Sequence, residues 1–339
     1  MSRLLLLELA LACALISAAA TGGVLLWLRR RDILDHPNDR SSHDRPTPRG
    51  AGLAVIPVIL IAWALLGLLG IVPEGLRVGG IVAATLALAA VSWRDDRGGL
   101  PVLVRLGAQF LAIGLGLFCL PGAGELFQGL LPPWLDLLAT ALIWVWFVNL
   151  FNFMDGIDGI AGAQAVVLGL GVAAVTFVVG DQQSGGLYLG VALAAAAAGF
   201  LPWNWQPARL FLGDVGSVPL GFLTGWLLLA LAGHGYWAPA VILPLYYLVD
   251  ATLTLANRAL RLQRVWEAHR EHVYQQAVLR GRSHAGVVIR VLAANLVLIL
   301  LALLAGLWPA VAALWVIVAF AVVALLIINL LRTPEPPVA

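Results

Sequence analysis

The stretch "NLFNFMDGIDGIAG", from Asn149 to Gly162, lies where one apolar run of the chain ends and the next begins. Two asparagines and two aspartates stand at this junction. A carboxylate held near hydrocarbon costs on the order of 2.5 to 3.5 kcal/mol, so acidic residues are rare there and mark functional sites. The stretch therefore predicts a membrane helix that ends at a functional site.

The composition places the whole chain in a membrane. Of its 339 residues, 61% are hydrophobic and 11% are charged, and the mean hydropathy is +0.95. These values exclude a soluble globular domain. Cys13 and Cys119 both stand in apolar runs, which predicts neither a disulfide framework nor a metal site. All twenty basic residues are arginine, which excludes lysine chemistry such as a Schiff base.

Apolar runs of membrane-spanning length predict an all-α, polytopic bundle that forms a single domain over residues 1–339. We expect about eleven transmembrane helices, or ten if the third or the seventh is too short to cross. The expected spans are 4–28, 50–71, 78–93, 103–120, 134–152, 160–179, 187–201, 215–232, 238–257, 285–306 and 309–331.

The distribution of arginine predicts the orientation, because positive residues are retained in cytoplasmic loops. Only Arg3 and Arg77 fall on one face of the predicted bundle, and the other eighteen arginines fall on the opposite face or its boundary. We therefore expect a bacterial inner-membrane protein with a periplasmic N-terminus and a cytoplasmic C-terminus. The first apolar run resembles a signal peptide, but its positive charges follow the run, which favours a retained helix.

Five expected cytoplasmic loops carry most of the polar side chains: 29–49, 94–102, 153–159, 202–214 and 258–284. The first contains "DHPNDRSSHDRPTPRGAG", whose Pro and Gly content argues against a helix. His43, Arg45 and Arg49 would suit a phosphate there, with glycines that let backbone amides approach it. An ordinary solvated loop is the alternative.

The second loop, "WRDDRGGLP", places Asp95 and Asp96 directly after an apolar run. Adjacent carboxylates repel each other. The pair therefore indicates a shared cation, a proton acceptor, or a helix end whose charge is balanced by Arg94 and Arg97.

The third loop follows the opening stretch. At helical spacing Asn149 and Asn152 are neighbours, as are Asn152 and Asp155. The glycines after Asp155 can break the helix and turn both Asp155 and Asp158 toward one site. A plain Asp-Gly turn is the alternative.

The fourth loop, "PWNWQPARLFLGDVGS", combines Asn204, Phe211, Asp214 and Ser217. An aromatic face for a planar base, an amide for its edge and a carboxylate for a cation would make a small nucleotide site. Helix capping is the alternative for Asp214.

The fifth loop contains Arg264 and two histidines, His269 and His272, three residues apart. An amphipathic cytoplasmic helix here would bind substrate phosphate or anionic lipid. Just before this loop, Asp250 lies inside a span, either as the partner of an arginine or as a site residue.

Three of these loops bring five aspartates to one membrane face: Asp95, Asp96, Asp155, Asp158 and Asp214. Their mutual repulsion requires a counter-cation. Mg²⁺ prefers carboxylates and substrate phosphate oxygens, and Mn²⁺ is the alternative. Arginines would hold the remaining phosphate charge. The pattern therefore predicts an enzyme that handles a pyrophosphate at the inner leaflet.

Together, and in this order, "DHPNDRSSHDRPTPRGAG", "DDRGGL", "NLFNFMDGIDGIAG", "FLGDVGS" and "HREHVYQ" resemble the motifs of the polyprenyl-phosphate N-acetylhexosamine-1-phosphate transferases. The resemblance covers about residues 35–284. It implies transfer of a sugar 1-phosphate from a UDP-N-acetylhexosamine to undecaprenyl phosphate in the lipid bilayer, with release of UMP.

The resemblance also implies residue roles. Asp95 and Asp96 would lie near the lipid phosphate, one of them as a candidate base. Asn152, Asp155 and Asp158 would line the nucleotide and sugar pocket, and Asp214, joined by Asp155, would bind Mg²⁺. Phe211 and Asn204 would bind uracil. The pyrophosphate or sugar would be contacted by His269, Arg270 and His272.

Departures from the family pattern favour one branch. Many members carry Arg-Lys where this chain has Arg40 and Ser41, so Arg45 or Arg49 would take the place of the lysine. The segment "AHREHVYQQAVLRGRSH" is similar to the branch that initiates O-antigen or capsule synthesis, with a deoxy N-acetylhexosamine ranked first. The muramoyl-pentapeptide transferase of peptidoglycan synthesis is the alternative, and a transporter of anionic solutes or lipids is the alternative from another class. We expect no nucleic-acid partner, and a homodimer stays open.

Overall fold

The protein is an all-α polytopic membrane protein. A computed structural model describes residues 3–37, 45–72, 75–123, 125–181, 185–264 and 269–332. The helices and strands are α1 (Arg3–Arg30), β1 (Leu34–Asp35), β2 (Thr47–Pro48), α2 (Gly52–Leu68), α3 (Gly75–Gly98), α4 (Val102–Phe118), α5 (Pro133–Phe153), α6 (Ile160–Val179), α7 (Gly186–Asn204), α8 (Asp214–Gly233), α9 (Trp237–Ile242), α10 (Leu245–Leu260), α11 (Val273–Leu279), α12 (His284–Leu307), η1 (Pro309–Val311) and α13 (Ala312–Leu331).

Each of the eleven expected spans corresponds to helix in the structure. Among the described residues, eight helices are long and apolar enough to cross a membrane. α2 and α4 have 17 residues each, about 26 Å of helix, close to the thickness of the hydrocarbon layer. The ninth span is divided into α9 and α10 at Leu243 and Pro244.

Three sequence predictions about lengths and boundaries were wrong. The third and seventh spans are full-length helices of 24 and 19 residues. α3 continues through Gly98, so Asp95 and Asp96 lie on its last turn rather than in a loop. The expected amphipathic helix after Asn257 is also absent from the described residues, because α10 ends at Leu260 and His269 and His272 precede α11.

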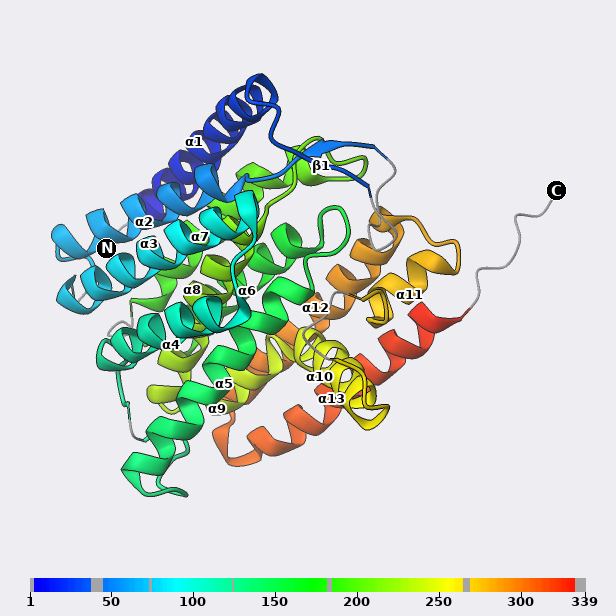
Figure 1. The fold of residues 1–339 in the computed structure, drawn as a ribbon. Coiled ribbons are helices and arrows are strands. Elements are labelled where there is room, and N and C mark those ends of the chain that lie inside the picture. The colour runs from blue at the N-terminus through cyan, green and yellow to red at the C-terminus, as the bar shows by residue number, and fades with distance from the viewer. Residues whose placement is uncertain are drawn as a thin grey trace.

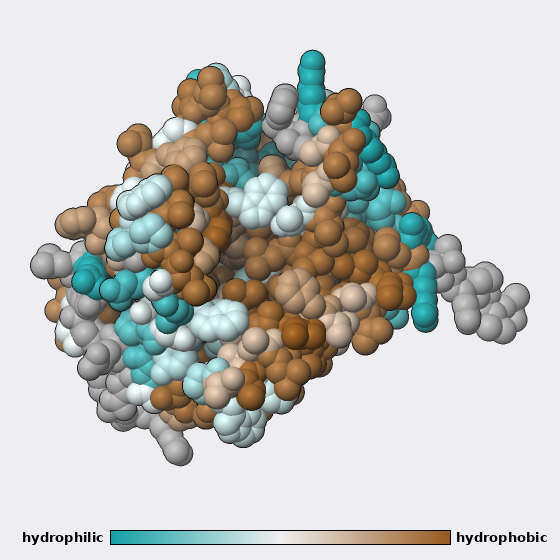
Figure 2. Space-filling view, turned by 90° about the horizontal axis from the view of Figure 1, so that it is seen from below, coloured by the Kyte–Doolittle hydropathy of each residue, from teal (hydrophilic) through white to brown (hydrophobic). Residues whose placement is uncertain are grey.

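The helices pack side by side, and the short elements β1 and α11 lie at one end of the bundle (Figure 1). We call this the arginine-rich end, defined by the antiparallel strands β1 and β2 (the hairpin), the connections 99–101, 154–159 and 205–213, and the segments 261–264 and 269–283. In the hairpin, Leu34 pairs with Pro48 and Asp35 with Thr47. Apolar side chains dominate the face of the molecule in Figure 2, as expected for a surface in contact with lipid.

α8 is the central helix, and almost all of it is buried. Its first turn touches the first turn of α2, since a Cβ added to Gly52 would lie 2.3 Å from the backbone nitrogen of Gly216. Glycine at this contact brings two helix N-termini together at the arginine-rich end. The segment that precedes α2, including Arg49, is thereby placed beside the first residue of α8.

Hydrogen bonds fix this placement. The amide of Phe211 donates to the carbonyl of Pro48 at 2.8 Å, and the amides of Gly50 and Ala51 donate to the carbonyl of Phe211 at 3.0 Å. The end of the hairpin therefore runs alongside the segment that leads into α8.

Candidate functional site

Arg49 joins two acidic residues from different helices. Its Nη2 lies 2.5 Å from Oδ1 of Asp214 at the start of α8 and 3.0 Å from Oδ1 of Asp96 at the end of α3. The Asp96 side chain is only 3% exposed, whereas that of Arg49 is 35% exposed. With Asp155, which interacts electrostatically with all three, these residues form what we call the Arg49 cluster.

The N-terminus of α8 explains why Asp96 is held so firmly. The Asp96 carboxylate accepts hydrogen bonds from the backbone amides of Asp214 at 3.0 Å and Val215 at 2.8 Å. These amides have no partner within the helix, and the positive end of the helix dipole favours an anion. Gly213 has a φ of 74°, which glycine adopts readily. Asp96 is thus a buried cap of α8.

The cluster contains three carboxyl groups and one guanidinium group. Burial lowers the pKa of Arg49, but the carboxylates of Asp214 and Asp96 outweigh that effect and raise it, so the guanidinium stays charged. Burial raises the pKa of the Asp155 carboxyl well above its ordinary value; Arg49 lowers it, and Asp214 and Asp96 raise it further. Three carboxyl groups around one guanidinium favour an additional cation.

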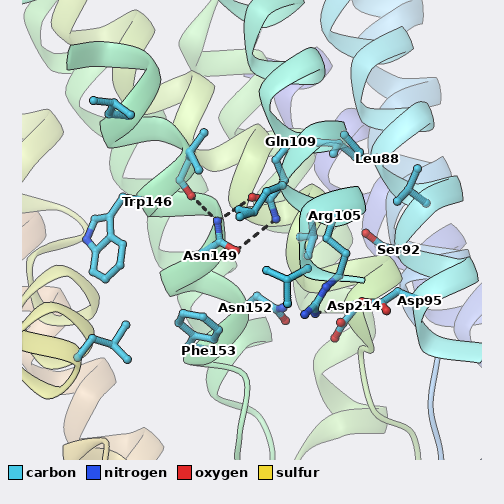
Figure 3. A pocket seen from close by; sticks show the side chains of 18 of the residues that line it. Leu88, Ser92, Asp95, Arg105, Gln109, Trp146, Asn149, Asn152, Phe153 and Asp214 are labelled. Atoms are coloured by element: carbon cyan, nitrogen blue, oxygen red, sulfur yellow. Dashed lines mark hydrogen bonds and ion pairs between the residues drawn. The ribbon is translucent and has the colours of Figure 1, made fainter. Parts of the chain in front are cut away.

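A groove of about 920 Å³ opens between α3, α4, α5 and α10. Most of its lining is apolar, and it follows α5 from Leu142 to Phe153, about 16 Å of helix. Figure 3 shows Asp95, Arg105, Asn152 and Asp214 near one another, with Asn149 and Gln109 further along the groove. His269 and His272 also line it.

Asp95 and Asp96 point to different partners. Asp95 accepts a hydrogen bond from the amide of Leu100 at 2.5 Å, and its Oδ2 lies 3.2 Å from Nη1 of Arg105. In the described residues, Asp95 therefore pairs with Arg105 and Asp96 with Arg49, and not with the flanking Arg94 and Arg97 that the sequence offered as one alternative. The shared cation expected between the two adjacent carboxylates is not supported by this geometry.

Arg105 is a groove residue that the sequence reasoning missed. It stands on α4, four residues after the helix-starting Pro101, and its buried Nε has no hydrogen-bond partner among the described residues. The available signal was a single arginine inside the apolar run expected at 103–120. An arginine inside an apolar run marks a candidate functional site.

The asparagines of α5 are engaged within the groove. Asn149 donates to Oε1 of Gln109 at 2.7 Å, and Gln109 donates back to Oδ1 of Asn149 at 3.3 Å (Figure 3). One turn later, Oδ1 of Asn152 accepts a hydrogen bond from the Ser217 hydroxyl at 2.7 Å. Asn152 and Ser217 thus connect α5 to α8 next to the Arg49 cluster, whereas Asn149 lies deeper.

A second pocket, of about 680 Å³, lies at the arginine-rich end and is more polar. It contains four residues expected in the substrate site: Arg45, Asp158, Phe211 and Arg270. It also contains residues that the sequence reasoning missed, among them Gln206, Gln275, Arg282 and His284. An aromatic ring and several guanidinium groups in one pocket suit a nucleotide phosphate.

The helix does break near Asp155, as predicted, because α5 ends at Phe153 and α6 begins at Ile160. The two aspartates nevertheless do different things. Asp155 belongs to the Arg49 cluster, whereas Asp158 accepts a hydrogen bond from the amide of Ala208 at 3.0 Å and lies 3.4 Å from Nδ1 of His284. The break therefore directs the two carboxylates to separate surroundings.

Asn204 has a different environment from the one expected for a uracil ligand. It is 3% exposed, its Oδ1 accepts a hydrogen bond from the Gly159 amide at 3.0 Å, and its Nδ2 donates to the carbonyl of Leu210 at 3.1 Å. Both ends of the amide are occupied by backbone groups. This geometry favours a structural role, in which Asn204 joins the loops before α6 and α8.

We expect Asn204→Ala to destabilise the fold by about 2–4 kcal/mol, because it leaves the amide of Gly159 and the carbonyl of Leu210 buried and unpaired. Thermal unfolding of the purified protein measures the effect. The exposed Asn257 on α10 provides the control, since Asn257→Ala removes the same side chain without a buried partner. Unchanged stability together with weaker nucleotide-sugar binding would instead assign Asn204 to uracil.

The segment before α11 contributes to both cavities. His269 and His272 line the groove with ring centroids 4.8 Å apart, and Arg270 lines the polar pocket. Burial, together with His272 and Arg258, lowers the pKa of His269 to about 4, so the ring is neutral at physiological pH. Arg264 lies outside both sets of lining residues, and its carbonyl accepts a hydrogen bond from Arg258. His43 lies outside the described residues.

The carboxylates of the Arg49 cluster would need substrate oxygens and water to complete the ligand shell of a divalent ion. In the described part of the chain, no three Asp, Glu, His or Cys side chains are arranged to hold a metal by themselves. Mg²⁺ is commonly bound through one or two carboxylates plus substrate phosphates and water. Asp214, which faces the groove and carries partly exposed oxygens, fits that kind of site, with Asp155 nearby.

The part of the chain that matches a known protein family includes Asp96, Asp155 and Asp214 of the Arg49 cluster. The family model described as glycosyl transferase family 4 matches residues 78–232. A probable undecaprenyl-phosphate N-acetylglucosaminyl 1-phosphate transferase of Bacillus subtilis (strain 168) is 28% identical, covering 74% of this chain and 71% of the relative.

Two further relatives have related names. The decaprenyl-phosphate N-acetylglucosaminephosphotransferase of Mycobacterium tuberculosis (strain ATCC 25618 / H37Rv) is 28% identical over 82% of this chain and 77% of its own length. A phospho-N-acetylmuramoyl-pentapeptide-transferase of Synechococcus sp. (strain JA-3-3Ab) is 34% identical over 67% of this chain and 69% of its own length.

Proposed function

Because this chain belongs to glycosyl transferase family 4, the polyprenyl-phosphate N-acetylhexosamine-1-phosphate transferases, we propose that it transfers a sugar 1-phosphate from a UDP-sugar to undecaprenyl phosphate. The products are undecaprenyl diphosphate-sugar and UMP. The class of sugar is an N-acetylhexosamine.

The observation that carries this proposal is the pair of neighbouring cavities with opposite character. Phe211 lines the polar pocket and Asp214, three residues later, lines the apolar groove. Likewise His269 lines the groove and its neighbour Arg270 lines the pocket. A lipid acceptor in the apolar groove and a nucleotide-sugar donor in the polar pocket would therefore approach the Arg49 cluster from two sides.

The groove would hold the acceptor. A prenyl chain would pack against the apolar lining along α5 as it does against lipid tails, and the lipid phosphate would then reach Arg105 and Asp95. Arg105 would neutralise phosphate charge, and Asp95 would orient the guanidinium through their ion pair. Asp95 lines the groove and Asp96 does not, so Asp95 is the candidate base of the pair.

The polar pocket would hold the donor. Phe211 offers a face for the uracil ring, and Arg45, Arg270 and Arg282 offer guanidinium groups for the phosphates. Asp158 is held by Ala208 and His284, with its carboxylate oriented for a sugar hydroxyl. His269 would contribute as a neutral ring.

The reaction is a displacement at phosphorus. An oxygen of the lipid phosphate forms a bond to the sugar-bearing phosphorus, and the bond from that phosphorus to the oxygen of UMP breaks. A fully ionised phosphate monoester needs no proton removed, so orientation and charge neutralisation would supply most of the rate. Mg²⁺ held by Asp214, with Asp155, would stabilise the negative charge on the diphosphate.

A panel of donors tests the proposal. Purified protein, undecaprenyl phosphate and Mg²⁺ are incubated with UDP-N-acetylglucosamine, UDP-linked deoxy N-acetylhexosamines and UDP-N-acetylmuramoyl-pentapeptide. We expect UMP and a butanol-extractable lipid product from at least one donor. The absence of turnover with every donor would contradict the proposal.

The same panel decides the pathway. We propose initiation of O-antigen or another surface polysaccharide, with a deoxy sugar as first choice. The similarity to the Synechococcus relative supports peptidoglycan synthesis as a second candidate, and turnover of the muramoyl-pentapeptide donor would select it. We also propose that the arginine-rich end faces the cytoplasm, since positive loops are retained there and nucleotide sugars are made there.

We expect Arg105→Gln to raise the KM for undecaprenyl phosphate by about 10- to 100-fold, because it removes one charge-assisted contact to phosphate. The KM for the UDP-sugar should change little. Steady-state kinetics with each substrate varied in turn measures the difference, and Arg97→Gln at the exposed end of α3 is the control. An equal rise in both KM values would remove Arg105 from the acceptor site.

A further inference from the structure

One face of α10 carries polar residues at every fourth position: Asp250, Thr254 and Arg258. Asp250 is fully buried. Its carboxylate accepts hydrogen bonds from the hydroxyls of Tyr246 at 3.0 Å and Thr254 at 3.3 Å. One of the two roles expected for Asp250 was that of partner to an arginine. No arginine is among its contacts in the described part of the chain.

The remaining contacts of Asp250 are with the segment from His272 to Tyr274, at the start of α11. The amides of Val273 and Tyr274, in the first turn of α11, donate to its two oxygens at 2.8 and 3.3 Å. Nδ1 of the buried His272 lies 3.5 Å from Oδ1 of Asp250. A carboxylate from inside the bundle thus holds the start of α11 in place.

Arg258 holds the same segment two turns further along α10. Its Nη1 forms an ion pair with Oε1 of Glu271, and its Nη2 donates to the carbonyl of Arg264 at 3.2 Å. The Arg258 side chain is almost completely buried, whereas Glu271 is partly exposed, so the pair is shielded from solvent on the arginine side. Arg261 contributes much less, because it is largely exposed and lies 3.9 Å from Glu271.

The segment from His269 to Gln275 forms a wall between the two cavities. His269 and His272 face the groove, whereas Arg270 and Gln275 face the polar pocket. At the far side of this wall, the hydroxyl of Tyr274 donates to the carbonyl of Phe153 at 3.0 Å, two residues before Asp155. The wall is therefore anchored to α10 on one side and to the end of α5 on the other.

We propose that Asp250 and Arg258 are positioning residues that hold this wall closed and so keep water away from the reacting phosphates. This inference rests on the proposed transferase function. Closed sites prevent the hydrolysis of reactive substrates. When the wall loosens, water replaces the lipid phosphate as the nucleophile: it bonds to the sugar-bearing phosphorus, the bond to UMP breaks, and sugar 1-phosphate is released.

The test compares two arginines on the same helix. In Arg258→Gln we expect the ratio of UMP released to lipid product formed to rise by about tenfold, because Glu271 loses the buried cation that holds it. Arg261→Gln should leave the ratio near that of the wild type. A variant that is merely less well folded would lower both products together and leave their ratio unchanged.

The charge swap separates the ion pair from general damage. Arg258→Glu and Glu271→Arg should each raise the ratio, and the double variant should restore it, since the attraction is rebuilt with the charges exchanged. Failure of the double variant to restore a ratio raised by both single variants would overturn the ion-pair role. A ratio that none of these variants raises would overturn the proposal itself.

A measurement without turnover distinguishes this inference from the proposed function. Hydrogen exchange of peptides covering residues 269–279 should be faster in Asp250→Asn and Arg258→Gln than in the wild type, while α8 keeps its protection. Unchanged exchange in residues 269–279 would overturn the proposal even if transfer is observed. If exchange is faster in the two variants but the wild type turns over no donor, the transferase function is contradicted. The anchoring of the wall by Asp250 and Arg258 would still hold.

Discussion

The Asp214→Asn variant is expected to lose about 1,000-fold in kcat for sugar-phosphate transfer. Asp214 stands at the one place where the apolar groove, the first turn of α8 and the guanidinium of Arg49 come together. An asparagine keeps the size of the side chain but removes the negative charge that would hold Mg²⁺ against the diphosphate. The loss should therefore appear in turnover rather than in folding.

Kinetics over a range of Mg²⁺ concentrations, with thermal unfolding in parallel, measures this effect. Asp32→Asn is a suitable control, because Asp32 is exposed at the same end of the molecule and its φ of 53° is one that asparagine adopts readily. A wild-type rate and Mg²⁺ dependence in Asp214→Asn would remove Asp214 from the metal site.

The Arg49→Ala variant is expected to lose about 100- to 1,000-fold in kcat/KM and to unfold at a lower temperature. Arg49 is the cation that lies between Asp96 and Asp214, and its removal leaves these carboxylates with Asp155 in a partly buried cluster. Breaking such a pair by removing one partner costs about 3–5 kcal/mol, because the remaining charge is uncompensated. The cap of α8 by Asp96 would be strained by the same repulsion.

Arg49→Lys separates charge from geometry. A lysine supplies one positive charge without the planar fork of arginine, so we expect it to recover stability more fully than activity. Arg30→Lys, at the exposed end of α1, controls for the exchange itself. Full activity in Arg49→Ala would show that the cluster does not take part in catalysis.

Local pattern was sufficient to predict the helices. The apolar run expected at 160–179 is α6 with the same bounds, because a left-handed glycine stands at each end of a continuous apolar sequence, Gly159 before it and Gly180 after it. The glycines after Asp155 likewise predicted the break after α5. Such features depend on a residue's own backbone preferences and on neighbours within one or two turns.

Side-chain partners were much harder to predict. Asp95 and Asp96 are adjacent in sequence, yet consecutive side chains on a helix point about 100° apart, and tertiary structure gave them separate arginines. Asn204 was expected to contact a base, but its amide is used by two loops that only the packing of α7 brings together. Neither outcome follows from spacing.

The sequence by itself determined that this chain is a helical membrane protein, that its polar residues gather at one end, and that its motifs belong to a known transferase family. Hydrophobicity, arginine bias and motif order are local properties, and they are readable without coordinates. Only the tertiary structure decided which charges meet. Arg49 and Asp214 are 165 residues apart in the chain, and they touch because glycines let α2 and α8 approach at their first turns. The anchoring of the wall by α10 has the same origin, since a buried ion pair depends on contacts that no linear pattern specifies.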